Sequence, residues 1–196
     1  MVRTNLLKYT VFIIVCLGFL NKTFSQKTTN TPDSLEKLLI KEQVDSNKIK
    51  LQLELFAFYY MNDTDKENHY LTLVSDLIDN SNTISSDMIY NIGHIYESYR
   101  SDYVTALKLY KKATDLAKSQ NNFEYINYQS WLGYTLAKTG EFEEGLSQLL
   151  NAVETAENKN LKTALPFSYT LLAFVYRDAG DFGKADMYFR KSIEAS

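Results

Sequence analysis

Cysteine, proline and glycine are scarce in this 196-residue chain. Cys16 is the only cysteine, and the chain has only two prolines and seven glycines. A single thiol cannot form a disulfide within the chain, and so little proline and glycine disfavours turn-rich β structure. Fifteen tyrosines and eleven phenylalanines, in a sequence that is 45% hydrophobic, instead favour a folded protein built of long helices.

The chain also lacks a basic stripe. Its formal charge is −3, and residues 1–25 contribute Arg3, Lys8 and Lys22 without any acid, so the remainder carries −6. Proteins that bind phosphate backbones concentrate Lys and Arg on one surface. We therefore expect no binding to nucleic acid.

The N-terminal residues have the pattern of a secretory signal. Met1–Lys8 is cationic, Tyr9–Leu20 is apolar, and Thr23-Phe24-Ser25 places small residues before a cleavage site. The apolar run is short for a membrane span, which needs about 20 residues. We expect 1–25 to be a cleaved signal peptide, 26–32 to be a flexible segment, and the protein to be periplasmic or at the cell surface of a bacterium. The alternative is an uncleaved anchor, and membrane contact is expected only through it or through residues beyond 196.

Three segments further along the chain repeat one helical pattern. Gly93, Gly133 and Ala173 are spaced 40 residues apart, each within an apolar helical stretch that is followed by a polar turn and a second helix. The second helices align on Ala106, Tyr110 and Ala113; on Gly145, Leu149 and Ala152; and on Ala185, Phe189 and Ser192. Their first spacing is 39 residues, which we interpret as one extra residue in the turn at Arg100-Ser101-Asp102. Such self-similarity is the signature of stacked helical units.

This pattern resembles the tetratricopeptide repeat (TPR), a helix–turn–helix unit of about 34 residues. The segment 166–196 carries the family pattern most fully, whereas 125–158 has Gly145 where Ala is usual, and the repeat around 87–118 lacks the turn glycine. The small residues predict close helix packing, and Gly140 and Gly180 are expected to end helices in the left-handed conformation.

The resemblance implies an all-α, right-handed superhelical solenoid of antiparallel helix hairpins. We place a TPR-like domain over 33–196, with hairpins at about 46–80, 87–118, 125–158 and 166–196. A short leading helix is expected over Ser34–Glu42, with Asp33 or Ser34 as its N-cap.

Motifs of catalysis and metal binding are missing. The acidic stretch Asn62–Asn68 begins like a calcium loop but has Asn68 and Val74 where that loop needs Gly and Glu, so a solvated turn is favoured. His69 and His94 lie in different hairpins without acids or other ligands at metal-site spacing. We expect no enzyme, cofactor or metal; a small hydrolase or metal-dependent enzyme is the least favoured hypothesis.

A binding groove is the favoured functional site. In TPR proteins the first helices line a concave groove, and the residue after each small position faces into it. That column is Phe58, His94, Tyr134 and Phe174, and its neighbours by the same argument are Tyr90, Glu97, Asn127, Lys138, Thr170 and Arg177. Flat rings suit a protein or peptide ligand, although they could equally serve only to pack neighbouring first helices together. The column has no Asn, which disfavours clamping of a peptide carboxylate.

The last hairpin leaves Phe189 and Ile193 without a following helix, which indicates docking to a partner or a chain that continues. The favoured function is a non-catalytic, exported protein-binding scaffold. The alternative, by resemblance alone, is the extracytoplasmic sensory region of a truncated membrane-bound sensor kinase or helix-turn-helix regulator.

Overall fold

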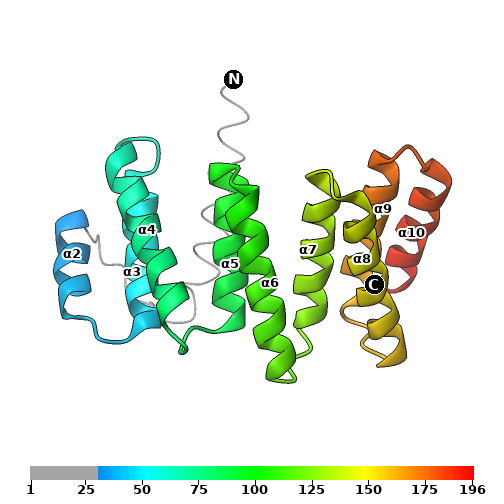
Figure 1. Ribbon diagram of the computed structural model, residues 1–196, viewed down its shortest axis with the longest axis horizontal. Coiled ribbons are helices and arrows are strands. Elements are labelled where there is room, and N and C mark those ends of the chain that lie inside the picture. Colours follow the sequence, from blue (N-terminus) through cyan, green and yellow to red (C-terminus); the bar gives the residue numbers. More distant parts are fainter. Residues whose placement is uncertain (1–30) are drawn as a thin grey trace. The chain divides into compact units, whose positions relative to one another are not determined.

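The computed structural model describes residues 31–196, and all the regular elements in that range are helical (Figure 1). They form two compact units, one ending at Thr83 and one spanning Ile84–Ser196. The predicted signal peptide and the beginning of the predicted flexible segment lie outside the described residues. Within residues 31–196, no helix has the length and apolar character needed to cross a membrane.

The first unit contains α2 (Pro32–Lys41), α3 (Asp45–Tyr59) and α4 (Thr64–Asn80). The leading helix begins earlier than predicted: Thr31, and neither Asp33 nor Ser34, is its N-cap and accepts from the Ser34 N–H. Pro32 fits the first helical position because its missing N–H would have no intrahelical partner there. In the acidic turn before α4, Asp63 caps the helix by accepting from the Lys66 N–H.

The second unit consists of three successive helix hairpins. They pair α5 (Ser86–Ile95), which continues into the π-helical turn η1 (Tyr96–Arg100), with α6 (Tyr103–Ser119); α7 (Tyr125–Lys138) with α8 (Phe142–Asn158); and α9 (Leu165–Asp178) with α10 (Phe182–Glu194). Each second helix also packs on the next first helix, α6 on α7 and α8 on α9. The predicted all-α architecture of stacked hairpins is confirmed.

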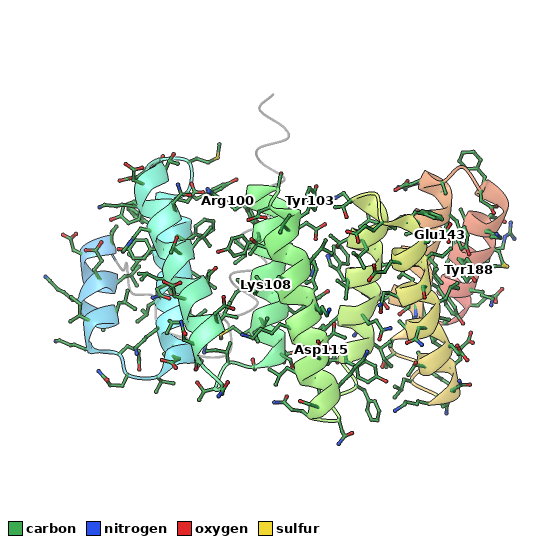
Figure 2. The ribbon with its side chains drawn as sticks, viewed as in Figure 1. Arg100, Tyr103, Lys108, Asp115, Glu143 and Tyr188 are labelled. Carbon is green, nitrogen blue, oxygen red and sulfur yellow. The ribbon has the colours of Figure 1, made fainter. Side chains whose placement is uncertain are left out.

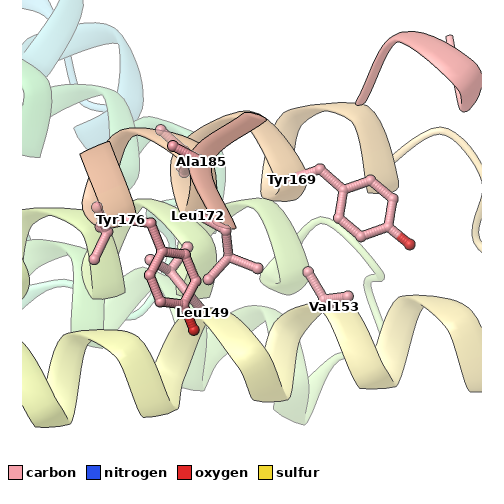
Figure 3. Packing of buried hydrophobic residues seen from close by; sticks show 8 residues of the cluster. Leu149, Val153, Tyr169, Leu172, Tyr176 and Ala185 are labelled. Atoms are coloured by element: carbon pink, nitrogen blue, oxygen red, sulfur yellow. The ribbon is translucent and has the colours of Figure 1, made fainter. Parts of the chain in front are cut away.

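The core between the last two hairpins shows how stacking buries what one hairpin leaves exposed (Figure 3). Leu149 and Val153 of α8 meet Leu172 and Tyr176 of α9, and Ala185 of α10 closes the cluster. Leu149 and Leu172 are completely buried. Burying a leucine side chain contributes about 1.5–3 kcal/mol, so these contacts between hairpins are a main source of stability.

Glycine allows the α7 and α8 backbones to touch. A Cβ added to Gly133 would lie 2.6 Å from the Gly145 carbonyl oxygen, and one added to Gly145 would lie 2.4 Å from the Gly133 carbonyl oxygen. The predicted close approach is therefore confirmed, and it explains why position 145 is Gly rather than the usual Ala.

The turns that end the first helices use a left-handed residue. Gly140 and Gly180 have φ of 107° and 82°, as predicted, and Ser101 takes this role in the first of these hairpins with φ of 54°. The extra residue predicted for the turn around Arg100 is accommodated within the helix end, because η1 widens the last turn before Ser101. The prediction that the extra residue lies in the turn between the two helices was therefore wrong.

Charged side chains lie on the exposed sides of the second helices. Lys108 and Asp115 occur along α6 after Tyr103, and Glu143 lies near the start of α8 (Figure 2). The exposed carboxylates of α8 also include Glu144, Glu154 and Glu157. The first helices, in contrast, carry most of the aromatic rings.

Candidate functional site

All the predicted site residues except Phe58 lie on the first helices of the second unit. Tyr90 and His94 are on α5; Asn127, Tyr134 and Lys138 are on α7; Phe174 and Arg177 are on α9. Phe58 is on α3 in the other unit, where it is 52% exposed and packs edge-on against Tyr59 at 5.4 Å.

Aromatic side chains connect α5, α7 and α9 through a series of ring contacts. Tyr90 and Trp131 both pack edge-on against His94 with centroid distances of 4.6 Å. Trp131 lies 5.4 Å from Tyr134, and Tyr134 lies 6.3 Å from Phe174. We call these five residues the aromatic row, and the surface of α5, α7 and α9 that carries it the first-helix face. All five side chains are half-buried.

Further rings support the row from the side. Tyr128 stacks on Tyr90 at 4.5 Å, Phe167 stacks on Trp131 at 5.9 Å, and Phe189 of α10 packs edge-on against Phe174 at 5.6 Å. The Tyr128 hydroxyl donates to the Asp87 carboxylate and so ties α7 to α5. These contacts hold the first helices together, and the row rings still keep part of their surface exposed.

A buried carboxylate lies behind the row. Glu97 is 6% exposed and accepts hydrogen bonds from the Tyr110 hydroxyl at 2.7 Å and from Trp131 Nε1 at 2.8 Å. His94 Nδ1 lies 3.0 Å from the same Tyr110 hydroxyl. Lys138 Nζ is 3.7 Å from the Glu97 carboxylate. The prediction of Glu97 as a groove position is therefore wrong, because its carboxylate is buried and connects η1 with α6 and α7.

Local features of the sequence place this network. A Cβ at Gly93 would lie 2.6 Å from Cε1 of Tyr110, so only glycine lets that ring reach across to α5. Glu97 lies within η1, and π-helical turns frequently occur at functional sites. Gly93 makes room for the Tyr110 ring, and the π-helical turn η1 contains Glu97, so both features help to place the Tyr110–Glu97 hydrogen bond.

Burial sets the protonation of the network. It lowers the pKa of His94 from 6.5 to about 4, and the Glu97 carboxylate only partly offsets this effect. Burial, followed by the nearby Glu97 carboxylate, raises the pKa of both Tyr90 and Tyr110 well above the ordinary range. At neutral pH the imidazole and both phenols are therefore uncharged.

Two cations flank the row near the ends of α7 and α9. Lys138, 43% exposed in its side chain, lies over the Tyr103 ring at 5.2 Å. The Arg177 guanidinium lies over the Phe174 ring at 4.9 Å and pairs with Asp178. A cation over the face of an aromatic ring is attracted to it, so these contacts favour the observed positions of the Lys138 and Arg177 side chains.

Two other residues that were predicted to lie in the groove, Asn127 and Thr170, make contacts outside the aromatic row. Asn127 donates to Glu124 at 2.8 Å, and its carbonyl oxygen is buried without a partner among the described residues. The Thr170 hydroxyl donates to the Pro166 carbonyl oxygen and lies 2.8 Å from the Ser192 hydroxyl of α10. Thr170 therefore packs between the two helices of the last hairpin.

Sequence reasoning missed Trp131, the residue that joins the row. Its equivalents in the other repeats are Asn91 and Leu171, so alignment of the repeats gives position 131 no aromatic signature. The one available signal for a special role of this residue was that Trp131 is the only tryptophan in the sequence. Among residues 31–196, no group of His, Cys, Asp and Glu side chains could hold a metal ion.

Comparisons with known proteins agree with this architecture. Residues 168–196 match the family model described as tetratricopeptide repeat. The chain is similar to the crystal structure of BtubC (BKLC) from P. vanneervenii, with 17% identity, a TM-score of 0.60, and coverage of 83% of this chain and 70% of that one. It is also similar to the crystal structure of MamA, with 19% identity, a TM-score of 0.55, and coverage of 84% of this chain and 85% of that one. At these identities the likeness extends to the fold alone. No curated protein sequence matches the chain.

Proposed function

We propose that this chain is a non-catalytic scaffold that binds a protein or peptide segment on the first-helix face. The observation that carries the proposal is the aromatic row, in which rings from three successive hairpins follow one another and stay partly exposed. Aromatic side chains give large contact areas at low entropic cost and dominate the energetics of protein interfaces. Lys138, over the Tyr103 ring, and Arg177, over the Phe174 ring, add hydrogen-bond donors on α7 and α9.

Peptide selection tests the proposal directly. A random-peptide library displayed on phage is selected on the full chain, and selected peptides are measured against Tyr134→Ala/Phe174→Ala and against Phe123→Ala. Phe123 is a matched control because it is a 49% exposed aromatic outside the row. We expect the double variant to lose at least about tenfold in affinity, since central aromatic residues often contribute more than 1 kcal/mol each. Circular dichroism must show unchanged helicity in both variants. Peptides that bind both variants like the wild type would refute the proposal.

We also propose that the scaffold is exported. The cationic start, apolar run and small residues of 1–25 support this proposal. Fractionation of the source cells, with N-terminal sequencing of the product, tests it. Export predicts a mature chain that starts at Gln26 outside the cytoplasm, whereas a cytoplasmic product that retains Met1 would contradict it.

A second docking surface is proposed on α10. Phe189 and Ile193 occupy the positions that Leu149 and Val153 occupy on α8. On α8 this pair is 0% and 7% exposed because α9 covers it, whereas Ile193 is 77% exposed.

We propose a second copy of the chain as the occupant of this surface. An isologous pair of α10 helices would cover Ile193 in both copies, as α9 covers the equivalent Val153 of α8.

A further inference from the structure

The imidazole of His94 has one nitrogen in the buried network and one outside it. Nδ1 lies 3.0 Å from the Tyr110 hydroxyl. Nε2 has no hydrogen-bond partner among residues 31–196, and the buried unpartnered side-chain atoms in that range belong to Gln52, Asn127, Gln129 and Thr135 instead. Because Nε2 is neither hydrogen-bonded nor one of those buried atoms, it is reached by solvent, while the rings of Tyr90 and Trp131 pack edge-on against the imidazole.

The network determines which nitrogen carries the proton. A tyrosine hydroxyl has one hydrogen, and a carboxylate can only accept. The Tyr110 hydroxyl therefore gives its hydrogen to Glu97, at 2.7 Å. Its oxygen is left as an acceptor, so the bond to His94 at 3.0 Å requires hydrogen on Nδ1. In the neutral ring, Nε2 is then the acceptor nitrogen.

Other groups around the imidazole keep this arrangement in place. The Trp131 N–H points at Glu97 Oε2 and the Tyr110 hydroxyl, at 2.8 and 3.1 Å, and Lys138 Nζ lies 3.7 Å from the other carboxylate oxygen of Glu97. The Tyr90 ring packs edge-on against the imidazole. None of these groups supplies a hydrogen to Nε2.

We propose that His94 Nε2 is a fixed hydrogen-bond acceptor on the first-helix face, and that it recognises a donor, such as a peptide N–H, in a segment bound along the aromatic row. This inference rests on the proposed function for its ligand, but the fixed tautomer is a property of the free protein. The rings of the row would give the partner contact area, and Nε2 would set its register along the face. A bound segment without a donor at that point would leave Nε2 desolvated and unpaired.

The tautomer is tested first, without any ligand. Long-range ¹H–¹⁵N spectra of the ¹⁵N-labelled full chain at pH 7 should show His94 with hydrogen on Nδ1. Glu97→Gln keeps an acceptor for the Tyr110 hydrogen and should preserve this tautomer. Glu97→Met removes that acceptor, so the Tyr110 hydroxyl should donate to Nδ1 and move the imidazole hydrogen to Nε2. Hydrogen on Nε2 in the wild-type protein would overturn the inference.

Binding is tested with a library-selected peptide that depends on Tyr134 and Phe174. His94→Gln places an amide oxygen within reach of the Nε2 position, whereas His94→Asn reaches only the Nδ1 position. We expect His94→Gln to bind like the wild type and His94→Asn to lose roughly 3- to 10-fold, the loss typical of one hydrogen bond. Equal binding by all three proteins would refute the role of Nε2 and leave the scaffold function standing. A selection that yields no peptide dependent on the row would refute the scaffold function, while the spectra would still decide the tautomer.

Discussion

At the level of single residues, Gly93 decides where the Tyr110 hydroxyl lies. Alignment of the repeats identified Gly93 as a small position and Tyr110 as a large one, but it could not show that they touch. Nor could it show that the hydroxyl of Tyr110 meets both His94 and Glu97. Side-chain hydrogen bonds depend on rotamers and on distances of a few tenths of an ångström, which the spacing of residue types does not encode.

Substitution of Gly93 by Ala should displace the Tyr110 ring. Because the added Cβ would lie 2.6 Å from Cε1 of that ring, we expect a loss of about 1–3 kcal/mol in the free energy of unfolding, as for other overpacked cores. Gly183→Ala on the exposed side of α10 is the control, since its Cβ would meet nothing closer than 3.7 Å. The control should gain up to about 1 kcal/mol from the higher helix propensity of Ala. Urea unfolding measures both variants, and equal stabilities would contradict the packing described.

The half-buried imidazole of His94 should make stability depend on pH in a defined window. The pKa of His94 is lowered from 6.5 to about 4 by burial, so between these values the unfolded chain binds a proton that the folded chain does not. Stability should therefore fall as pH decreases from 6.5 to 4, by up to about 3 kcal/mol, with no further contribution from His94 below pH 4.

Because carboxylates titrate in the same range, the comparison is made with His94→Gln. Urea unfolding of both proteins at pH 7.5 and pH 4.5 should show the larger loss on acidification in the wild type. Equal losses would mean that His94 titrates alike in the folded and unfolded chains.

At the level of elements, the repeat pattern predicted the hairpins well because small and large residues recur at fixed spacing. The position of the extra residue in the α5–α6 hairpin could not be predicted. A count of residues between Gly93 and Ala106 gives the length of the connection, but not whether a helix end or a turn accommodates it. The structure places it in η1, where it sets the position of Glu97. The N-cap of α2 was missed because Thr31, Asp33 and Ser34 are all residue types that favour capping.

The α10 helix should mediate self-association. Ile193→Lys places a charge in the proposed interface, so light scattering should show a dimer for the wild type and a monomer for this variant. Val104→Lys on α6 is the matched control, because Val104 is 82% exposed and lies away from α10. The control should remain dimeric. A wild type that is monomeric at tens of micromolar would rule out the proposed dimer at those concentrations.

At the level of the whole chain, each compact unit has its own buried core. Leu55, Phe56, Val74 and Ile78 are fully buried in the first unit, and the buried residues of the second unit begin at Ile84. The three hairpins of the second unit also contain all the ring contacts of the aromatic row. In arrays of repeats each hairpin depends mainly on its neighbours, so three successive hairpins can suffice for folding.

A fragment of residues 84–196 should therefore fold by itself. We expect cooperative unfolding, and Trp131 fluorescence like that of the full chain, because the groups around the indole come from α5, η1, α6, α7 and α9. A shorter fragment, 103–196, is the control: it lacks α5 and η1, so Tyr110 loses both Glu97 and His94 and becomes exposed on one side. The control should show a red-shifted Trp131 emission and a lower unfolding midpoint. If 84–196 were instead unfolded while the full chain is folded, the second unit would depend on residues before Ile84, and its row could not be studied as an independent binding module.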